Sequence, residues 1–270
     1  MTGNTKKKVT VPLLLQKKER GEKIVMVTCY DYPSARLLEE AGIDIVFVGD
    51  SVGTTMLGYR DTVPVTMEEM IHHAKAVCRG VRHALALVDM PFLSYQISPE
   101  EALRNAGHIL KETGAMAVKL EGGTAIAPTV QKLVGAGIPV MGHLGFTPQA
   151  VHLLGGPRAQ GKDEASSEQM LADARALVEA GVFAIVLELI PTSLARRITE
   201  AVPVPTIGIG AGPHCDGQVQ VFHDLFGLNS DRTFKHAKRY TDIGTAIRSA
   251  AMCFAAEVRA GEFPGEEHGI

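Results

Sequence analysis

The stretch Ile45-Val46-Phe47-Val48-Gly49-Asp50 joins a short apolar run to a glycine and a carboxylate. Apolar residues without polar alternation are typical of a strand that is buried on both faces of a parallel sheet. Similar runs recur along the chain. They cover Ile24–Cys29, Ile45–Val48, Ala84–Val88, Ala115–Leu120, Ile138–Met141, Phe183–Leu187, Pro205–Ile209 and Val219–Phe222. The pattern predicts eight strands, of which the last is the least regular.

Amphipathic segments separate these runs. Thr66 and Glu69 form a capping box ahead of an apolar stripe, and Ser98 with Pro99 marks a second helix start. Further helices are expected at Pro33–Glu40, Ala125–Ala136, Glu168–Ala180, Ser193–Glu200 and Asp242–Arg259. Strands that alternate with helices in this way predict a closed TIM (β/α)₈ barrel, with an open doubly wound sheet as the alternative.

The N-terminal region carries two further expectations. Val11–Arg20 is expected to form an extra N-terminal helix that closes the bottom of the barrel. Residues 1–10, with the basic triplet Lys6-Lys7-Lys8, are expected to be a disordered tip. Residues 11–270 are expected to form a single domain, because α/β barrels of about 250 residues are common.

Composition narrows the class of partner. A formal net charge of −3 gives no electrostatic reason to expect nucleic acid or anionic lipid. No apolar run approaches the roughly 20 residues that span a bilayer, and no signal-peptide pattern opens the chain. The cysteines Cys29, Cys78, Cys215 and Cys253 are scattered, which indicates reduced thiols in a cytoplasmic protein. Composition therefore gives no reason to expect a nucleic acid or a membrane as the partner.

Ionisable residues close five consecutive apolar runs. They are Asp50, Asp89, Glu121, His143 and Glu188, from the second predicted strand to the sixth. A parallel barrel brings these strand ends to one face, where catalytic groups gather. Any one of them could instead cap a helix or start a turn. Together the carboxylates would repel one another unless a cation or Lys119 compensates them. Oxygen donors without cysteine favour a hard divalent cation such as Mg²⁺, with Mn²⁺ as the alternative.

Two of these residues have sequence surroundings that suggest a functional role. Glu188 follows the apolar run Ala184–Leu187, and a poorly solvated carboxylate is suited to act as a general base. His143 lies between Gly142 and Gly145, which leaves room for a ligand, although a buried core histidine is the alternative.

Three glycine-containing segments are candidates for functional loops. The segment Asp50–Tyr59 is expected to lie over the rim, and Gly145–Asp163 is long and polar enough to form a lid. The run Gly208–Gly212 could bind phosphate on its backbone amides, or it could simply form a tightly packed turn.

The motifs taken together resemble the ketopantoate hydroxymethyltransferase family, within the phosphoenolpyruvate mutase/isocitrate lyase-like barrels. The resemblance runs in order from about residue 11 to the C-terminus. It rests on Thr28–Tyr32, Val48–Gly53, Pro64–Thr66, Asp89–Phe92, Lys119–Gly123, Gly142–Gln149, Ile207–Gly212, Asp216–Val219 and Phe263–His268. The run Pro157-Arg158-Ala159 departs from the family's usual pattern, and Pro213-His214-Cys215 is a variable position, which leaves the lid and the folate contacts open.

The resemblance implies a reaction and a set of site residues. A hydroxymethyl group would pass from 5,10-methylenetetrahydrofolate to 3-methyl-2-oxobutanoate, through a metal-stabilised enolate, giving 2-dehydropantoate in pantothenate biosynthesis. It also implies Mg²⁺ and a homodecamer of two pentameric rings. Asp50, Asp89 and Glu121 would hold the metal, and Glu188 would be the catalytic base. The oxo acid would be bound by Asp50, Ser51, Asp89, Lys119 and His143.

Two other functions compete with this interpretation. A metal-dependent C–C lyase or phosphonomutase would share the barrel, but such lyases carry a lid cysteine after a mid-barrel strand. No cysteine lies between Cys78 and Cys215 here. A non-catalytic barrel that binds a metabolite would need neither Glu188 nor the pair Lys119 and Glu121.

Overall fold

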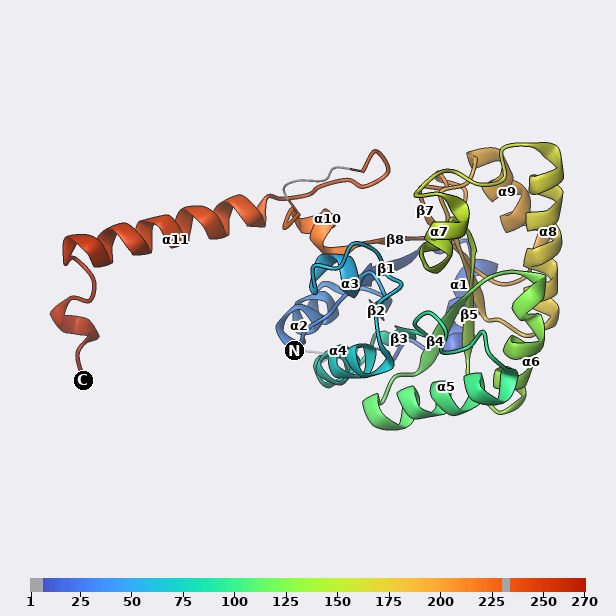
Figure 1. Cartoon of the computed structure of the whole chain (residues 1–270), viewed down its shortest axis with the longest axis horizontal. Coiled ribbons are helices and arrows are strands. Elements are labelled where there is room, and N and C mark those ends of the chain that lie inside the picture. The colour runs from blue at the N-terminus through green and yellow to red at the C-terminus, as the bar shows by residue number, and fades with distance from the viewer. Residues whose placement is uncertain (1–6, 230–233) are drawn as a thin grey trace. The chain divides into compact units, whose positions relative to one another are not determined.

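A computed structural model of the chain describes residues 7–229 and 234–270. It divides into two compact units, Met1–Val221 and Phe222–Ile270. The first unit is a closed barrel of eight parallel strands in sequence order (Figure 1). These are β1 (Ile24–Thr28), β2 (Ile45–Val48), β3 (Leu85–Asp89), β4 (Ala117–Glu121), β5 (Val140–Gly145), β6 (Ala184–Glu188), β7 (Thr206–Ile209) and β8 (Gly217–Gln220). The predicted TIM barrel is confirmed, and the open doubly wound alternative is wrong.

The closure depends on β8, which begins two residues earlier than the sequence pattern predicts. Gly217 pairs with Ile24 of β1, and a Cβ atom at Gly217 would lie only 2.4 Å from the Ile24 carbonyl oxygen. The strand contains Gln218 and Gln220, so it lacks the apolar run that marks the other strands. Its position is determined by pairing with the neighbouring strands β1 and β7, and not by its own hydrophobicity.

Helices surround the strands of the first unit (Figure 1). They are α1 (Val11–Glu19), α2 (Tyr32–Ala41), α3 (Val52–Thr55), α4 (Met67–Gly80), α5 (Pro99–Thr113), α6 (Ala127–Gly135), α7 (Val151–Leu154), α8 (Glu164–Glu179) and α9 (Thr192–Ala201), with 3₁₀ turns η1 (Thr124–Ile126) and η2 (Pro148–Ala150). The predicted capping box starts α4: the Thr66 side chain accepts from Glu69 N–H, and the Glu69 carboxylate accepts from Thr66 N–H. α8 begins four residues before the predicted Glu168, because the Asp163 carboxylate caps it by accepting from Ser166 N–H.

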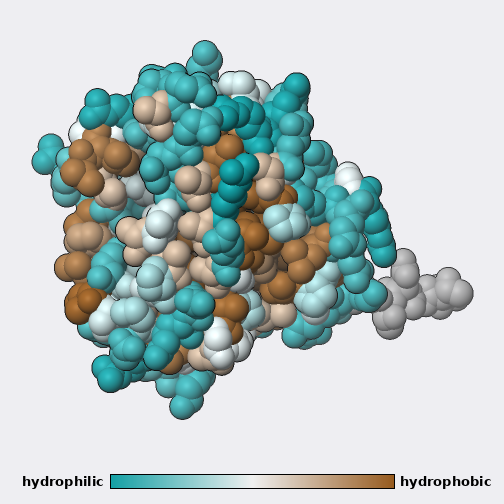
Figure 2. All heavy atoms as spheres, turned by 90° about the vertical axis from the view of Figure 1, so that its right-hand side faces the viewer, coloured by the Kyte–Doolittle hydropathy of each residue, from teal (hydrophilic) through white to brown (hydrophobic). Residues whose placement is uncertain are grey.

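The amphipathic outer helices keep polar residues on the surface. α8 buries Met170, Leu171, Ala174 and Leu177 against the barrel, whereas Glu168 and Arg175 are exposed. Figure 2 shows the side of the molecule that carries α8, where hydrophilic residues cover most of the periphery and hydrophobic ones appear between them.

The extra N-terminal helix, α1, packs on the N-terminal ends of the strands. Leu14 of α1 is completely buried and belongs to a cluster that includes Ile24, Ile45 and Leu85, each the first residue of its strand. This placement matches the expected closure of the barrel bottom. Of the tip expected at residues 1–10, residues 1–6 lie outside the described residues, and Val9 N–H donates to the His83 carbonyl at 2.6 Å.

The second unit contains α10 (Phe222–Phe226), α11 (Ile243–Ala260) and the 3₁₀ turn η3 (Glu266–His268). α11 matches the helix predicted near Asp242–Arg259, with the Asp242 carboxylate as its cap. The expectation that residues 11–270 form one domain stays a prediction. No helix in the described parts of the chain is both long and apolar enough to cross a membrane.

Candidate functional site

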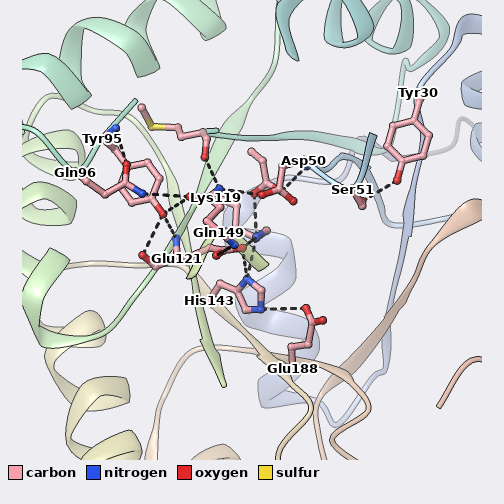
Figure 3. A network of polar contacts seen from close by, with 12 residues as sticks. Tyr30, Asp50, Ser51, Tyr95, Gln96, Lys119, Glu121, His143, Gln149 and Glu188 are labelled. Carbon is pink, nitrogen blue, oxygen red and sulfur yellow. Dashed lines mark hydrogen bonds and ion pairs between the residues drawn. The ribbon is translucent and has the colours of Figure 1, made fainter. Parts of the chain in front are cut away.

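The C-terminal ends of β2–β6 bring the predicted rim residues together (Figure 3). Asp50 lies two residues beyond the end of β2, Asp89 ends β3, Glu121 ends β4, and Glu188 ends β6. His143 lies within β5 and pairs in register with Glu121, as Lys119 does with Asp89. Because neighbouring strands pair these residues directly, their side chains lie next to one another at the same end of the barrel.

Lys119 is the cation at the centre of the group. Its Nζ lies 2.9 Å from Asp89 Oδ1, 3.9 Å from Glu121 Oε1 and 3.0 Å from His143 Nδ1. Burial by itself lowers the pKa of Lys119, but the charges of Asp89, Glu121 and Asp50 outweigh it and raise that pKa above its ordinary value. Lys119 is therefore a fixed ammonium group at this face.

Ionised together, the three acids would carry more negative charge than Lys119 can balance. Burial, with the charge of Glu121, raises the pKa of Asp50 to about 6. Burial raises the pKa of Glu121 to about 7, although Lys119 opposes the shift, and it raises the pKa of Asp89 as well. Asp89 Oδ1 faces the Lys119 ammonium group at 2.9 Å, whereas Glu121 Oε1 is, within the described residues, a buried oxygen without a hydrogen-bond donor in good geometry. A further positive charge would stabilise this cluster.

His143 connects Lys119 to Glu188. Burial, reinforced by the charge of Lys119, lowers the pKa of His143, so the ring is neutral near pH 7. An ammonium group only donates, so Nδ1 of His143 accepts from Lys119 and the ring proton lies on Nε2. Nε2 is 3.3 Å from Glu188 Oε2. This tautomer places an N–H group beside the predicted base, at a geometry short of a hydrogen bond.

Glu188 is the most accessible acid of the group. Its side chain is 18% exposed, against 4% or less for Asp89, Lys119, Glu121 and His143. The apolar run before Glu188 predicted a poorly solvated carboxylate, but the strand buries its other residues more completely than this last one. Glu188 is therefore the acid of the group that a molecule in solution can reach most readily.

Ser51 lies apart from this network. Its hydroxyl forms a hydrogen bond of 2.8 Å with the Tyr30 hydroxyl, and the pair is separate from the Lys119 group in Figure 3. Burial raises the pKa of Tyr30 to about 12, which keeps its hydroxyl protonated. Ser51 also precedes the short helix α3, which occupies part of the predicted Asp50–Tyr59 loop.

Two neutral residues of the site escaped the sequence prediction. The Gln149 side chain donates to Asp50 Oδ2 and to the Met90 carbonyl, both at 2.9 Å. The buried Tyr95 hydroxyl donates to Gln149 Oε1 at 2.8 Å and accepts from Glu121 N–H at 3.1 Å. Neither residue closes an apolar run, so the strand-end criterion could not select them. The one available signal was the position of Gln149 at the end of the motif Gly142–Gln149.

The segment Gly145–Asp163 starts in close contact with β6. Phe146 N–H donates to the Glu188 carbonyl at 2.8 Å, and a Cβ atom at Gly145, where φ is +98°, would lie 2.1 Å from that oxygen. Farther along, His152 of α7 lies 3.6 Å from Asp61 in the connection after β2. The segment thus contacts two sides of the rim, and its role as a lid stays a prediction.

The glycines in and after β7 allow other side chains to pack closely against the backbone. Gly212 has a φ of +81°, and a Cβ atom there would lie 2.5 Å from the Thr192 hydroxyl. A Cβ atom at Gly208 would lie 3.0 Å from Cys215 Sγ. The tightly packed turn accounts for these glycines without a bound phosphate.

The oxygen atoms of the three acids suit a hard cation, but their positions do not form a coordination shell. Asp50, Asp89 and Glu121 supply only oxygen ligands, which Mg²⁺ prefers. Across residues 7–229 and 234–270, however, no three His, Cys, Asp or Glu side chains surround a common metal position. Lys119 Nζ lies among the acids instead. Binding a cation would require these side chains to turn.

Solved structures share the barrel at low sequence identity. A phosphonopyruvate hydrolase solved with oxalate and Mg²⁺ matches with a TM-score of 0.62 and 12% identity, over 96% of this chain and 90% of that one. A 2,3-dimethylmalate lyase of the phosphoenolpyruvate mutase/isocitrate lyase superfamily matches with a TM-score of 0.60 and 15% identity, over 96% and 91%. These likenesses support the fold alone.

Sequence comparison is far more specific. A 3-methyl-2-oxobutanoate hydroxymethyltransferase of Moorella thermoacetica is 59% identical over 97% of both chains. The enzyme of that name from Chloroflexus aurantiacus is 56% identical over 97% of this chain and 92% of its own length. The family model for ketopantoate hydroxymethyltransferase matches residues 8–266. With the strand-end residues and their surroundings in place, the chain belongs to the ketopantoate hydroxymethyltransferase family.

Proposed function

We propose that this protein transfers a hydroxymethyl group from 5,10-methylenetetrahydrofolate to 3-methyl-2-oxobutanoate, giving 2-dehydropantoate for pantothenate biosynthesis. The observation that carries the proposal is the continuous group Asp89–Lys119–His143–Glu188 on one barrel face, in a chain that is 59% identical to an enzyme named for this activity. In the reaction C3 of the oxo acid loses a proton and forms a bond to the one-carbon unit. Water supplies the hydroxyl oxygen, and tetrahydrofolate leaves.

Glu188 is the proposed base. The C3 hydrogen is acidic because it is adjacent to the ketone, and a carboxylate within reach can remove it. Glu188 is the most exposed acid of the group, and His143 Nε2 lies 3.3 Å from its Oε2. This contact involves one carboxylate oxygen and leaves the other for the substrate.

Lys119 is the proposed charge that stabilises the substrate after the proton has left. Its ammonium group is buried beside the rim acids, where the low dielectric strengthens its interaction with a developing negative oxygen. Asp50, Ser51, Asp89 and His143 complete the proposed oxo-acid site. Ser51 would reach the substrate by exchanging its bond to Tyr30 for one to the ligand.

Asp50, Asp89 and Glu121 are the proposed ligands of Mg²⁺ or another divalent cation. When bound, the cation would supply positive charge next to the ketone oxygen as the C3 proton leaves. Support comes from three buried acids whose pKa values are raised and from the unsatisfied oxygen of Glu121. The raised pKa values of these acids mean that the cation would displace protons from them.

We also propose a homodecamer in the cytoplasm, with small molecules as its ligands. Support for self-association comes from α11, where Ile247 and Phe254 are each 56% exposed and Val258 is 46% exposed. These residues follow the i, i+7, i+11 spacing of one helix face, and an exposed apolar stripe of this kind favours burial against a partner. Cys29, Cys78, Cys215 and Cys253 are all free thiols, which fits a reducing compartment.

The direct test is an assay with purified protein, 3-methyl-2-oxobutanoate and 5,10-methylenetetrahydrofolate. We expect 2-dehydropantoate to form with Mg²⁺, to cease with EDTA and to resume when Mg²⁺ is added in excess. The absence of EDTA-sensitive product would refute the proposal. Cleavage of the oxo acid without folate would instead support a metal-dependent C–C lyase.

A further inference from the structure

Gln149 is a neutral side chain among the acids of the site, and it is only 5% exposed. It lies in η2, near the start of the Gly145–Asp163 segment. A buried amide costs free energy unless its polar atoms find partners. The partners of Gln149 therefore indicate why an amide stands here.

Every hydrogen-bonding position of the Gln149 amide is used. Nε2 donates to Asp50 Oδ2 and to the Met90 carbonyl, each at 2.9 Å. Oε1 accepts from the Tyr95 hydroxyl at 2.8 Å and from Gln96 Nε2 at 3.2 Å. Two donated and two accepted bonds complete the capacity of a side-chain amide.

These partners also determine which way the amide points. The Met90 carbonyl can only accept, so the atom facing it must be the nitrogen. With the amide turned over, its oxygen would face the Met90 oxygen and its nitrogen would face Gln96 Nε2. The amide therefore has one stable orientation, and Asp50 Oδ2 is held by it.

Gln149 also reaches a second acid through its backbone. Its N–H donates to Glu121 Oε2 at 3.0 Å. Asp50 follows β2 and Glu121 ends β4, while Gln149 comes from the connection after β5 (Figure 3). One residue thus holds an oxygen of two acids that come from different strands.

We propose that Gln149 is a positioning residue: it anchors one oxygen of Asp50 and one of Glu121, and so limits how far the two carboxylates must turn to take up a divalent cation. The inference rests on the proposed function, in which these acids are metal ligands. Gln149 acts through the two carboxylates and needs no contact with the oxo acid. Tyr95 supports it by holding Oε1 of the amide and the backbone N–H of Glu121.

The test is calorimetric titration of Mg²⁺ alone into the full-length protein and its variants. Gln149→Met keeps the size of the side chain and removes its hydrogen bonds. We expect the Kd for Mg²⁺ to rise about 10–100-fold, the usual effect of removing an outer partner of metal ligands. Tyr95→Phe removes one hydroxyl and should raise this Kd by about three- to tenfold. Gln131→Met, at an exposed position of α6, is the matched control and should leave the Kd unchanged.

A second readout separates positioning from a merely structural role. Saturating Mg²⁺ should restore the kcat of Gln149→Met to near the wild-type value, with an unchanged KM for the oxo acid. A lower melting temperature with an unchanged Mg²⁺ Kd would overturn the inference, and so would a wild-type Kd in Tyr95→Phe if Gln149→Met does not fold. The two proposals fail in different ways. If the wild type neither binds Mg²⁺ nor forms product, the proposed function fails. If the wild type does both and the variants bind Mg²⁺ with the same Kd, only the role of Gln149 fails.

Discussion

At the scale of single residues, Asp50 illustrates how the site balances charge. It is 3% exposed, its Oδ2 accepts from Gln149, and its backbone N–H donates to Asp89 Oδ2 at 2.9 Å. Burial raises its pKa to about 6, so the carboxylate is costly to ionise without a cation. This cost supports the proposed role of Asp50 as a metal ligand.

Asp50→Ala should weaken Mg²⁺ binding. Removal of a ligand should raise the Kd by at least the roughly 10–100-fold caused by losing an outer partner. Calorimetry with Mg²⁺ measures the change, and Glu40→Gln on the surface of α2 is the control. An unchanged Kd in Asp50→Ala would remove Asp50 from the proposed ligands.

The charged residues of the site were accessible to sequence analysis because each closes an apolar run. Asp89, Glu121, His143 and Glu188 were predicted to meet at the rim, and the structure places them in one network. Gln149 and Tyr95 were not predicted, because they are uncharged and lie outside the strands, where no apolar run points to them. Their role arises only from contacts between residues that are far apart in sequence.

At the scale of elements, Glu39 joins α2 to the connection between α4 and β3. Its carboxylate accepts from His83 N–H and His83 Nδ1, both at 2.8 Å, and from Ala84 N–H at 3.0 Å. Burial alone would raise the pKa of Glu39, but these hydrogen bonds outweigh it and lower the pKa below 4.5. The ionised form therefore stabilises the fold.

Glu39→Gln should lower the free energy of unfolding by about 1–3 kcal/mol at pH 7, because an amide N–H₂ would face the Ala84 N–H. Since the folded-state pKa is depressed, the stabilisation by Glu39 is complete above the unfolded value and is lost as the pH falls through the folded value. Urea unfolding should thus show a smaller difference between wild type and variant at pH 4 than at pH 7. A difference independent of pH would contradict this account. Glu40→Gln serves as the control.

Element boundaries show where sequence patterns stop being informative. The start of α4 was predicted correctly because the capping box is local. The start of α8 was placed too late, since its polar first turn carries no apolar periodicity, and its cap is Asp163. The position of β8 depends on pairing with β1 and β7, which no local pattern reports.

At the scale of the whole molecule, α11 carries the clearest sign of association. None of its 18 residues is fully buried, and Ile247, Phe254 and Val258 share one face. The barrel follows from strand and helix alternation in the sequence, but the decamer came only from the resemblance. The apolar face of α11 supports the proposed self-association, and the number of copies comes from the resemblance.

Phe254→Glu should reduce the size of the assembly, because a charge in an apolar interface is costly to bury. Light scattering after size-exclusion chromatography should give about ten times the chain mass of 28.8 kDa for the wild type and a smaller mass for this variant. Ser249→Glu, on the opposite face of α11, should leave the mass unchanged. A monomeric wild type, or a Phe254→Glu variant of full mass, would contradict the proposed role of α11.

The central claim is that Glu188 removes the C3 proton of the oxo acid at this barrel face. Proton NMR in heavy water measures that step without folate, as exchange of the C3 hydrogen of 3-methyl-2-oxobutanoate in the presence of Mg²⁺. We expect exchange with the wild type, and a loss of about 100-fold or more in Glu188→Gln with oxo-acid binding retained, as removal of a general base requires. Exchange at the wild-type rate in Glu188→Gln would contradict the account.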